Sequence, residues 1–164
     1  MPGTFVPDKD YQIFTTLSEY RLAVDTVIAS AQSTLDIYDT DLAELGFEDR
    51  ARHDSLRIFL AQGAAQRLRI VLLDQLFIQQ RAARMQNLMR DFSRQVEIRV
   101  LAEKRDADTF IYSDAGVCLY RPQHDHAKSI LTIGDMSRYR LLGGRFAQMF
   151  DMAEQSVSSA VLGL

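Results

Sequence analysis

Residues 55–74 read SLRIFLAQGAAQRLRIVLLD, and this stretch decides the class of fold. Its first half has apolar residues at helical spacing and predicts a helix that ends near Gly63. Its second half includes four consecutive apolar residues at 70–73, typical of a central strand covered on both faces. A helix followed by a buried strand predicts an α/β domain.

The pattern extends in both directions from this stretch. Upstream, Thr16 and Glu19 form a capping box that predicts the start of a helix. The other elements expected from apolar spacing are strands at 34–38, 96–100, 110–112, 117–120 and 129–133, a long helix over 75–94, and a closing helix from Ser137.

The order of these elements predicts their arrangement in space. Early alternation of helix and strand implies parallel strands with right-handed crossovers, and the late strands imply an antiparallel edge. We predict an α/β three-layer sandwich with a mixed, mainly parallel central sheet. Residues 15–164 are expected to form one domain, after an irregular leader at 1–14.

The amino-acid composition limits the class of protein to which this chain can belong. The chain has 164 residues, 47% hydrophobic and 25% charged, with a net charge of −3. This balance is that of a globular protein and argues against a general nucleic-acid binder. The sole cysteine, Cys118, excludes an internal disulfide and fits a reducing compartment. With no signal peptide and no membrane-spanning stretch, we expect a cytoplasmic protein.

Three stretches together resemble the phospholipase D superfamily. Residues 22–42, LAVDTVIASAQSTLDIYDTDL, resemble the opening helix and first strand of that family. Residues 55–74 are similar to its second helix and central strand. Residues 96–120 resemble the strand and hairpin that carry its catalytic motif, with Asp114 in the hairpin. The resemblance implies a phospholipase D-like half-domain.

The catalytic signature of that family is H-x-K-x-x-x-x-D followed by G-S-x-N. In the family, the histidine attacks phosphorus, while the lysine and asparagine hold phosphate oxygens. When the motif is aligned on Asp114, Ala107 stands in place of the histidine and Thr109 in place of the lysine. The segment Arg121 to His124 reads RPQH in place of G-S-x-N. The resemblance therefore implies that the ancestral phosphodiesterase reaction has been lost.

Two residues of this region are candidates for binding a ligand. Asp114 is one, although a hairpin aspartate often bonds only the amides of its own turn. Arg121 is the other, since its guanidinium can pair with a phosphate or carboxylate through two hydrogen bonds. Asp36, Asp39 and Asp41 also cluster near the end of the first strand, the edge at which α/β sheets place ligands.

A second catalytic candidate is the polar segment with His124, His126 and Lys128. His126 and Lys128 repeat the H-x-K spacing, but Ile133 stands where the motif requires aspartate. Zinc binding would need a third ligand that the sequence does not supply. We expect no metal and no cofactor, and a polar loop is the plainer interpretation. The arginines over 81–94 are likewise interpreted as a solvated helix face.

Three functions remain open from the sequence. The first is a catalytically inactive phospholipase D-like domain with a binding or regulatory role. The second is a repurposed phosphodiesterase that uses His124, His126 and Lys128. The third is a nucleic-acid-binding module. The resemblance also implies a homodimer, because the family builds its active site between two halves; a protein partner is compatible with the first function.

Overall fold

The computed structural model describes residues 11–103 and 107–157. The strands are β1 Tyr11–Phe14, β2 Thr34–Asp39, β3 Arg67–Leu72, β4 Val96–Val100, β5 Thr109–Ser113, β6 Val117–Arg121, β7 Ser129–Ile133 and β8 Glu154–Val157. The helices are α1 Leu17–Ser30, α2 Arg50–Ala61, α3 Leu76–Arg81, α4 Ala83–Asp91 and α5 Met136–Met152.

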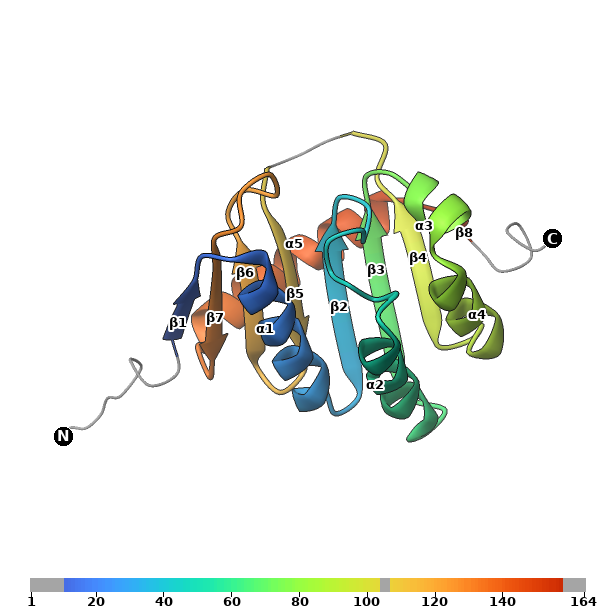
Figure 1. Cartoon of the computed structure of the whole chain (residues 1–164), viewed down its shortest axis with the longest axis horizontal. Coiled ribbons are helices and arrows are strands. Elements are labelled where there is room, and N and C mark those ends of the chain that lie inside the picture. The colour runs from blue at the N-terminus through green and yellow to red at the C-terminus, as the bar shows by residue number, and fades with distance from the viewer. Residues whose placement is uncertain (1–10, 104–106, 158–164) are drawn as a thin grey trace.

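All described strands join one sheet in the order β1-β7-β6-β5-β2-β3-β4-β8 (Figure 1). Only β2–β3 and β3–β4 pair in parallel; the other pairs in this described sheet are antiparallel. The prediction of a mainly parallel sheet is therefore wrong. Helical crossovers make parallel pairs only among β2, β3 and β4, whereas the hairpin strands β5 to β7 extend the sheet from β2 in antiparallel fashion.

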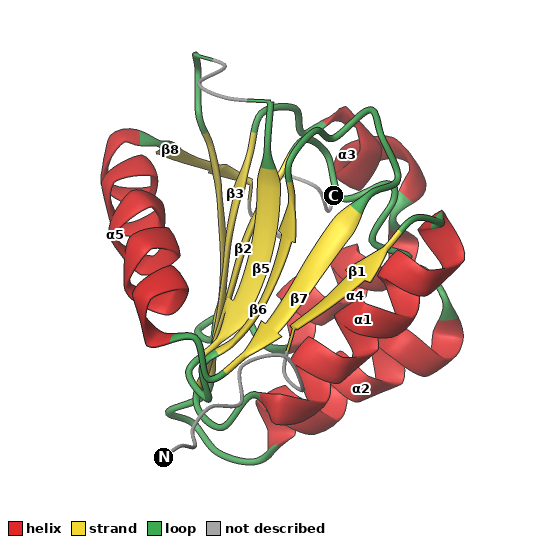
Figure 2. Cartoon of the chain, turned by 90° about the vertical axis from the view of Figure 1, so that its left-hand side faces the viewer, coloured by secondary structure: helices red, strands yellow, loops and turns green. Residues whose placement is uncertain are grey.

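Helices lie on both faces of the sheet. Among the described helices, Figure 2 shows α5 on one face of the sheet and α1, α2, α3 and α4 on the opposite face. A larger core lies under α1, α2 and α4, and a smaller one lies under α5. Successive strand residues point to opposite faces, so the same strands contribute to both cores. We refer below to the α1 face and the α5 face of the sheet.

The structure confirms the capping box and the hairpin, two features predicted from residues that are close in sequence. The Thr16 hydroxyl accepts from the amide of Glu19, whose carboxylate accepts from the amide of Thr16, which completes the capping box. The predicted hairpin is β5–β6, and its turn includes Gly116 at φ 80°. Cys118 is a buried free thiol in β6. Among the described helices, none is long and apolar enough to cross a membrane.

Strand β8 was not predicted, and two further parts of the chain differ from the prediction. Residues 11–14, assigned to the irregular leader, form β1 and pair with β7; residues 1–10 lie outside the described residues. The long helix over 75–94 is divided into α3 and α4 at Ala82. The Glu48 carboxylate accepts from the amides of Arg84 and Met85, and so caps α4 from a distant loop. This long-range cap starts a second helix where apolar spacing alone predicts continuity.

Candidate functional site

The positions aligned with the catalytic histidine and lysine lie at the start of β5. Ala107 is exposed, and its carbonyl accepts a hydrogen bond from the amide of His124 at 2.9 Å. Thr109 points to the α1 face and is only 2% exposed. Its hydroxyl has no hydrogen-bond partner within the described residues. Neither side chain can supply the nucleophile or the cation of phosphodiester hydrolysis.

Asp108, between these two residues, points to the opposite face and pairs with α5. Its carboxylate accepts from both terminal nitrogens of Arg145, at 2.6 and 2.9 Å. Burial tends to raise the pKa of Asp108, but hydrogen bonds from Arg145 and Tyr120 outweigh burial and hold the pKa below its ordinary value. The carboxylate is therefore a fixed anion that anchors α5 to the start of β5.

Arg121 stands directly opposite Thr109 on the neighbouring strand β6. It is 3% exposed, so its guanidinium is enclosed by the protein. Nη1 donates to Glu44 Oε1 at 2.9 Å, and Nε donates to the carbonyl of His126 at 2.6 Å. The guanidinium carbon also lies 5.0 Å from the ring centroid of Tyr20. Arg121 thus ties α1 and two loops to the sheet.

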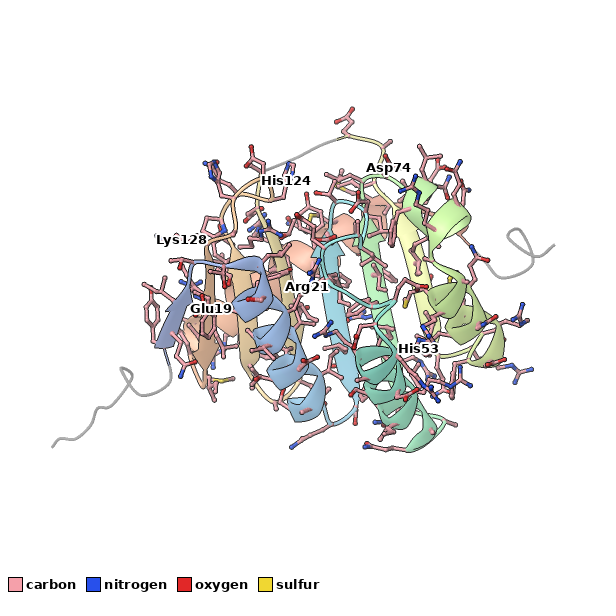
Figure 3. All side chains as sticks on the ribbon, viewed as in Figure 1. Glu19, Arg21, His53, Asp74, His124 and Lys128 are labelled. Atoms are coloured by element: carbon pink, nitrogen blue, oxygen red, sulfur yellow. The ribbon has the colours of Figure 1, made fainter. Side chains whose placement is uncertain are left out.

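Glu44 is held in place by a second arginine. Arg21 Nε, on α1, donates to the backbone carbonyl of Glu44 at 3.0 Å. Figure 3 shows Arg21 projecting from α1. Sequence reasoning did not identify Glu44 or Arg145, because they lie 77 and 37 residues from their partners Arg121 and Asp108. No local spacing carries that information.

The three aspartates expected to cluster near the end of β2 are divided between the two faces of the sheet. Asp36 lies on the α5 face and pairs with Arg69 at 2.7 Å. Asp39 lies on the α1 face, where it accepts from the amides of Asp41 and Leu42. Burial raises the pKa of Asp39 to about 6. Within the described residues, no three His, Cys, Asp or Glu side chains are grouped to hold a metal ion.

The His124 to Lys128 segment forms a loop between β6 and β7. The side chain of His126 is 68% exposed, and its Nε2 lies 3.8 Å from Asp125 Oδ1. Lys128 is also exposed. Figure 3 places His124 and Lys128 on this outer loop. The backbone of the loop is fixed by Arg121, while its imidazole at 126 faces solvent.

Asp114 lies at the far end of β5 from Thr109. Its two carboxylate oxygens accept from the amides of Gln32 and Ser33, both at 2.9 Å. The carboxylate therefore joins the β5–β6 hairpin to the turn between α1 and β2. Among the candidate residues, Arg121 contacts the backbone of His126. Asp114 lies at the opposite end of β5 from this contact.

Comparison with known proteins places this chain in a family and in a fold. The chain belongs to the family described as "Domain of unknown function (DUF7931)", whose model matches residues 16–160. No curated protein matches it.

Three solved structures show the fold. TrmBL2, described as an archaeal chromatin protein with a novel mode of DNA binding, has a TM-score of 0.67 at 14% identity over 90% of this chain. NucT from Helicobacter pylori has a TM-score of 0.63 at 10% identity, covering 89% of this chain and 98% of its own. Nuc from Salmonella typhimurium, a phospholipase D family member, has a TM-score of 0.60 at 12% identity, covering 91% of this chain and 100% of its own.

These similarities bear on the fold alone. This chain spans about half of the TrmBL2 chain, of which 54% is covered. The fold is phospholipase D-like, with a mixed sheet between helices.

Proposed function

We propose that this member of the DUF7931 family is a phospholipase D-like domain without phosphodiesterase activity, which acts by binding. The observation that carries the proposal is the buried pair of Thr109 and Arg121. At the position aligned with the catalytic lysine, the chain has an uncharged hydroxyl. The neighbouring guanidinium is bound to groups of the same protein.

Phosphodiester hydrolysis needs space for a phosphate beside the nucleophile and its cationic donors. Here the corresponding face is closed, since Thr109 is 2%, Arg121 3% and Asp39 6% exposed. A phosphate at this position would also approach two carboxylates, that of the buried Asp39 and that of the half-exposed Glu44, which is bound to Arg121. The charged groups at this position bind one another, which supports a structural role for them.

The alternative is a repurposed phosphodiesterase that uses His124, His126 and Lys128. The exposed His126 imidazole is accessible to a substrate, which is the observation in favour of it. Against it, the buried Arg121 contacts this loop through the carbonyl of His126 and directs no charge to the imidazole. Hydrolysis by an exposed histidine without converging donors would be inefficient.

The deciding experiment is hydrolysis of an aryl phosphodiester by wild-type protein and by His126→Ala, with and without chelator. We expect no turnover above background in any sample, with a known phosphodiesterase as the assay control. Turnover that resists chelator and disappears in His126→Ala would instead establish the loop as a metal-free histidine site. Gln123→Ala, a change in the same loop, is the matched control for that loss.

Two further properties belong to this proposal. The homodimer implied by the family resemblance is retained as a proposal. A cytoplasmic location, suggested by the single cysteine, Cys118, is also retained as a proposal.

A further inference from the structure

Positive charge is concentrated in one part of this acidic chain. Residues 50–99 contain ten arginines and four Asp or Glu residues. The remainder contains nine basic and eighteen acidic residues. The net charge of −3 therefore conceals a strongly cationic segment, which forms α2, β3, α3, α4 and β4.

Part of this segment lines a groove of about 430 Å³ on the α5 face of the sheet. The groove includes Arg67 and Arg69 from β3, Arg94 from the turn before β4, Glu97 from β4 and Phe150 from α5. It lies at the starts of β2, β3 and β4, the sheet edge opposite Arg121 and Thr109. It is therefore separate from the vestigial catalytic motif.

The acidic groups near the groove are already neutralised. Asp36 accepts two hydrogen bonds from Arg69, at 2.7 and 2.9 Å. Glu97 is bound by Arg99, at 2.8 Å. The guanidinium groups of both arginines also lie over the ring of Phe150, at 5.3 and 3.9 Å from its centroid. These contacts hold the Arg69 and Arg99 side chains in place, and their charges are offset by those of Asp36 and Glu97.

Two exposed arginines at the groove are left without a carboxylate. Arg67 Nη1 donates to the carbonyls of Ala64 and Gln66, at 2.6 and 3.0 Å, which fixes its guanidinium without neutralising it. Arg94 forms no ion pair or hydrogen bond within the part of the chain that the structure describes. Their planar guanidinium groups are suited to phosphate oxygens.

We propose that this groove binds phosphate groups of a nucleic-acid backbone, without reading base sequence. A polymer is favoured over a small anion because the excess of arginine is not confined to the groove: Arg90, exposed in the last turn of α4, lies four residues before Arg94 in the sequence. Backbone contacts are favoured over base stacking because Phe150 is 8% exposed and covered by two arginines. The proposal names a ligand for the binding role and does not depend on the loss of catalysis.

The test is fluorescence anisotropy with a labelled oligonucleotide of mixed sequence over a series of salt concentrations. In Arg67→Gln/Arg94→Gln we expect affinity to fall roughly tenfold, and the slope of log affinity against log salt to fall by about 2. Arg94→Gln alone should lower that slope by about 1, and it removes no described contact on which folding depends. Arg140→Gln, the same change at an exposed residue of α5 outside the groove, should leave both values unchanged.

Several outcomes would overturn the proposal. These are no binding by wild-type protein at low salt, an equal loss in Arg140→Gln, or tight binding of pyrophosphate with no binding of oligonucleotide. Cleavage of the oligonucleotide, followed on a gel, would contradict the proposed inactivity. If the groove variants still weakened binding, that cleavage would leave the assignment of the groove standing, so the two proposals fail separately.

Discussion

Asp39 and Arg121 are both buried on the α1 face. Within the described residues Arg121 forms an ion pair with Glu44, whereas Asp39 forms none. Asp39 instead accepts from the amides of Asp41 and Leu42. The Leu42 backbone has φ 73°, a left-handed conformation that is uncommon for a bulky residue. The buried carboxylate thus helps to hold an unfavourable turn, at an electrostatic cost that depends on pH.

The change Asp39→Asn tests this cost. Burial raises the pKa of Asp39 to about 6 in the folded protein, so around pH 5 the folded state binds a proton that the unfolded state has released. Unfolding free energy from this group therefore falls as pH rises from about 4 to about 6, because the folded state binds more protons. An asparagine keeps the acceptor for Leu42 but does not titrate.

We expect the stability of Asp39→Asn relative to wild type to increase by about 2 to 3 kcal/mol between about pH 4 and 7. Urea unfolding at a series of pH values measures this difference. The matched control is Asp125→Asn, in which the substituted side chain is 69% exposed. A difference between Asp39→Asn and wild type that stays constant with pH would contradict the assignment.

At the scale of elements, Asp114 joins two turns that are distant in sequence. It was a candidate ligand-binding residue, but its two oxygens accept from the amides of Gln32 and Ser33. Asp114→Ala would leave both amides without this charged acceptor. We expect a loss of about 1 to 3 kcal/mol in unfolding free energy, measured by urea unfolding.

Asp114→Asn provides the graded control, since its one carbonyl oxygen can keep one of the two hydrogen bonds. Neither variant should change oligonucleotide affinity, because Asp114 does not line the arginine groove. Weaker ligand binding with unchanged stability would restore the ligand-binding interpretation of this residue.

Elements set by neighbouring residues could be predicted from the sequence, and those set by distant side chains could not. The capping box at Thr16 and the strand at Ser129–Ile133 follow from local spacing and are confirmed. The division between α3 and α4 depends on Glu48, 36 residues before Arg84. Apolar periodicity cannot report such a cap, because it records only which face is buried.

The same distinction applies to the site. The proposed loss of the motif can be argued from the sequence, because a motif of fixed spacing aligned on Asp114 puts Ala107 and Thr109 at its histidine and lysine positions. The enclosure of Arg121 by Glu44 and Tyr20 requires three elements to come together. The sequence could therefore indicate which positions to compare with the motif, but not which side chains surround Arg121.

At the scale of the whole molecule, the two cores share the strands that separate them. Ile37 and Tyr38, adjacent on β2, belong to different cores, as do Ile70 and Val71 on β3. Loss of packing on either face would therefore release the same backbone from the sheet. We infer that both faces unfold together in one cooperative transition, as expected if residues 15–164 form a single domain.

Two core truncations on opposite faces test this coupling. Phe146→Ala, on the sheet-facing side of α5, should cost about 3 to 5 kcal/mol, and Leu56→Ala, on that of α2, about 2 to 5 kcal/mol, because each removes a fully buried side chain. Each variant should unfold in urea in one transition, with equal midpoints by far-ultraviolet circular dichroism and tyrosine fluorescence. Tyr20 and Tyr112 lie in different cores, so the fluorescence samples both faces. Separate transitions in either variant would show that the α5 face unfolds independently. A common shift of both midpoints would show that one cooperative sheet supports both the enclosed Arg121 site and the arginine groove.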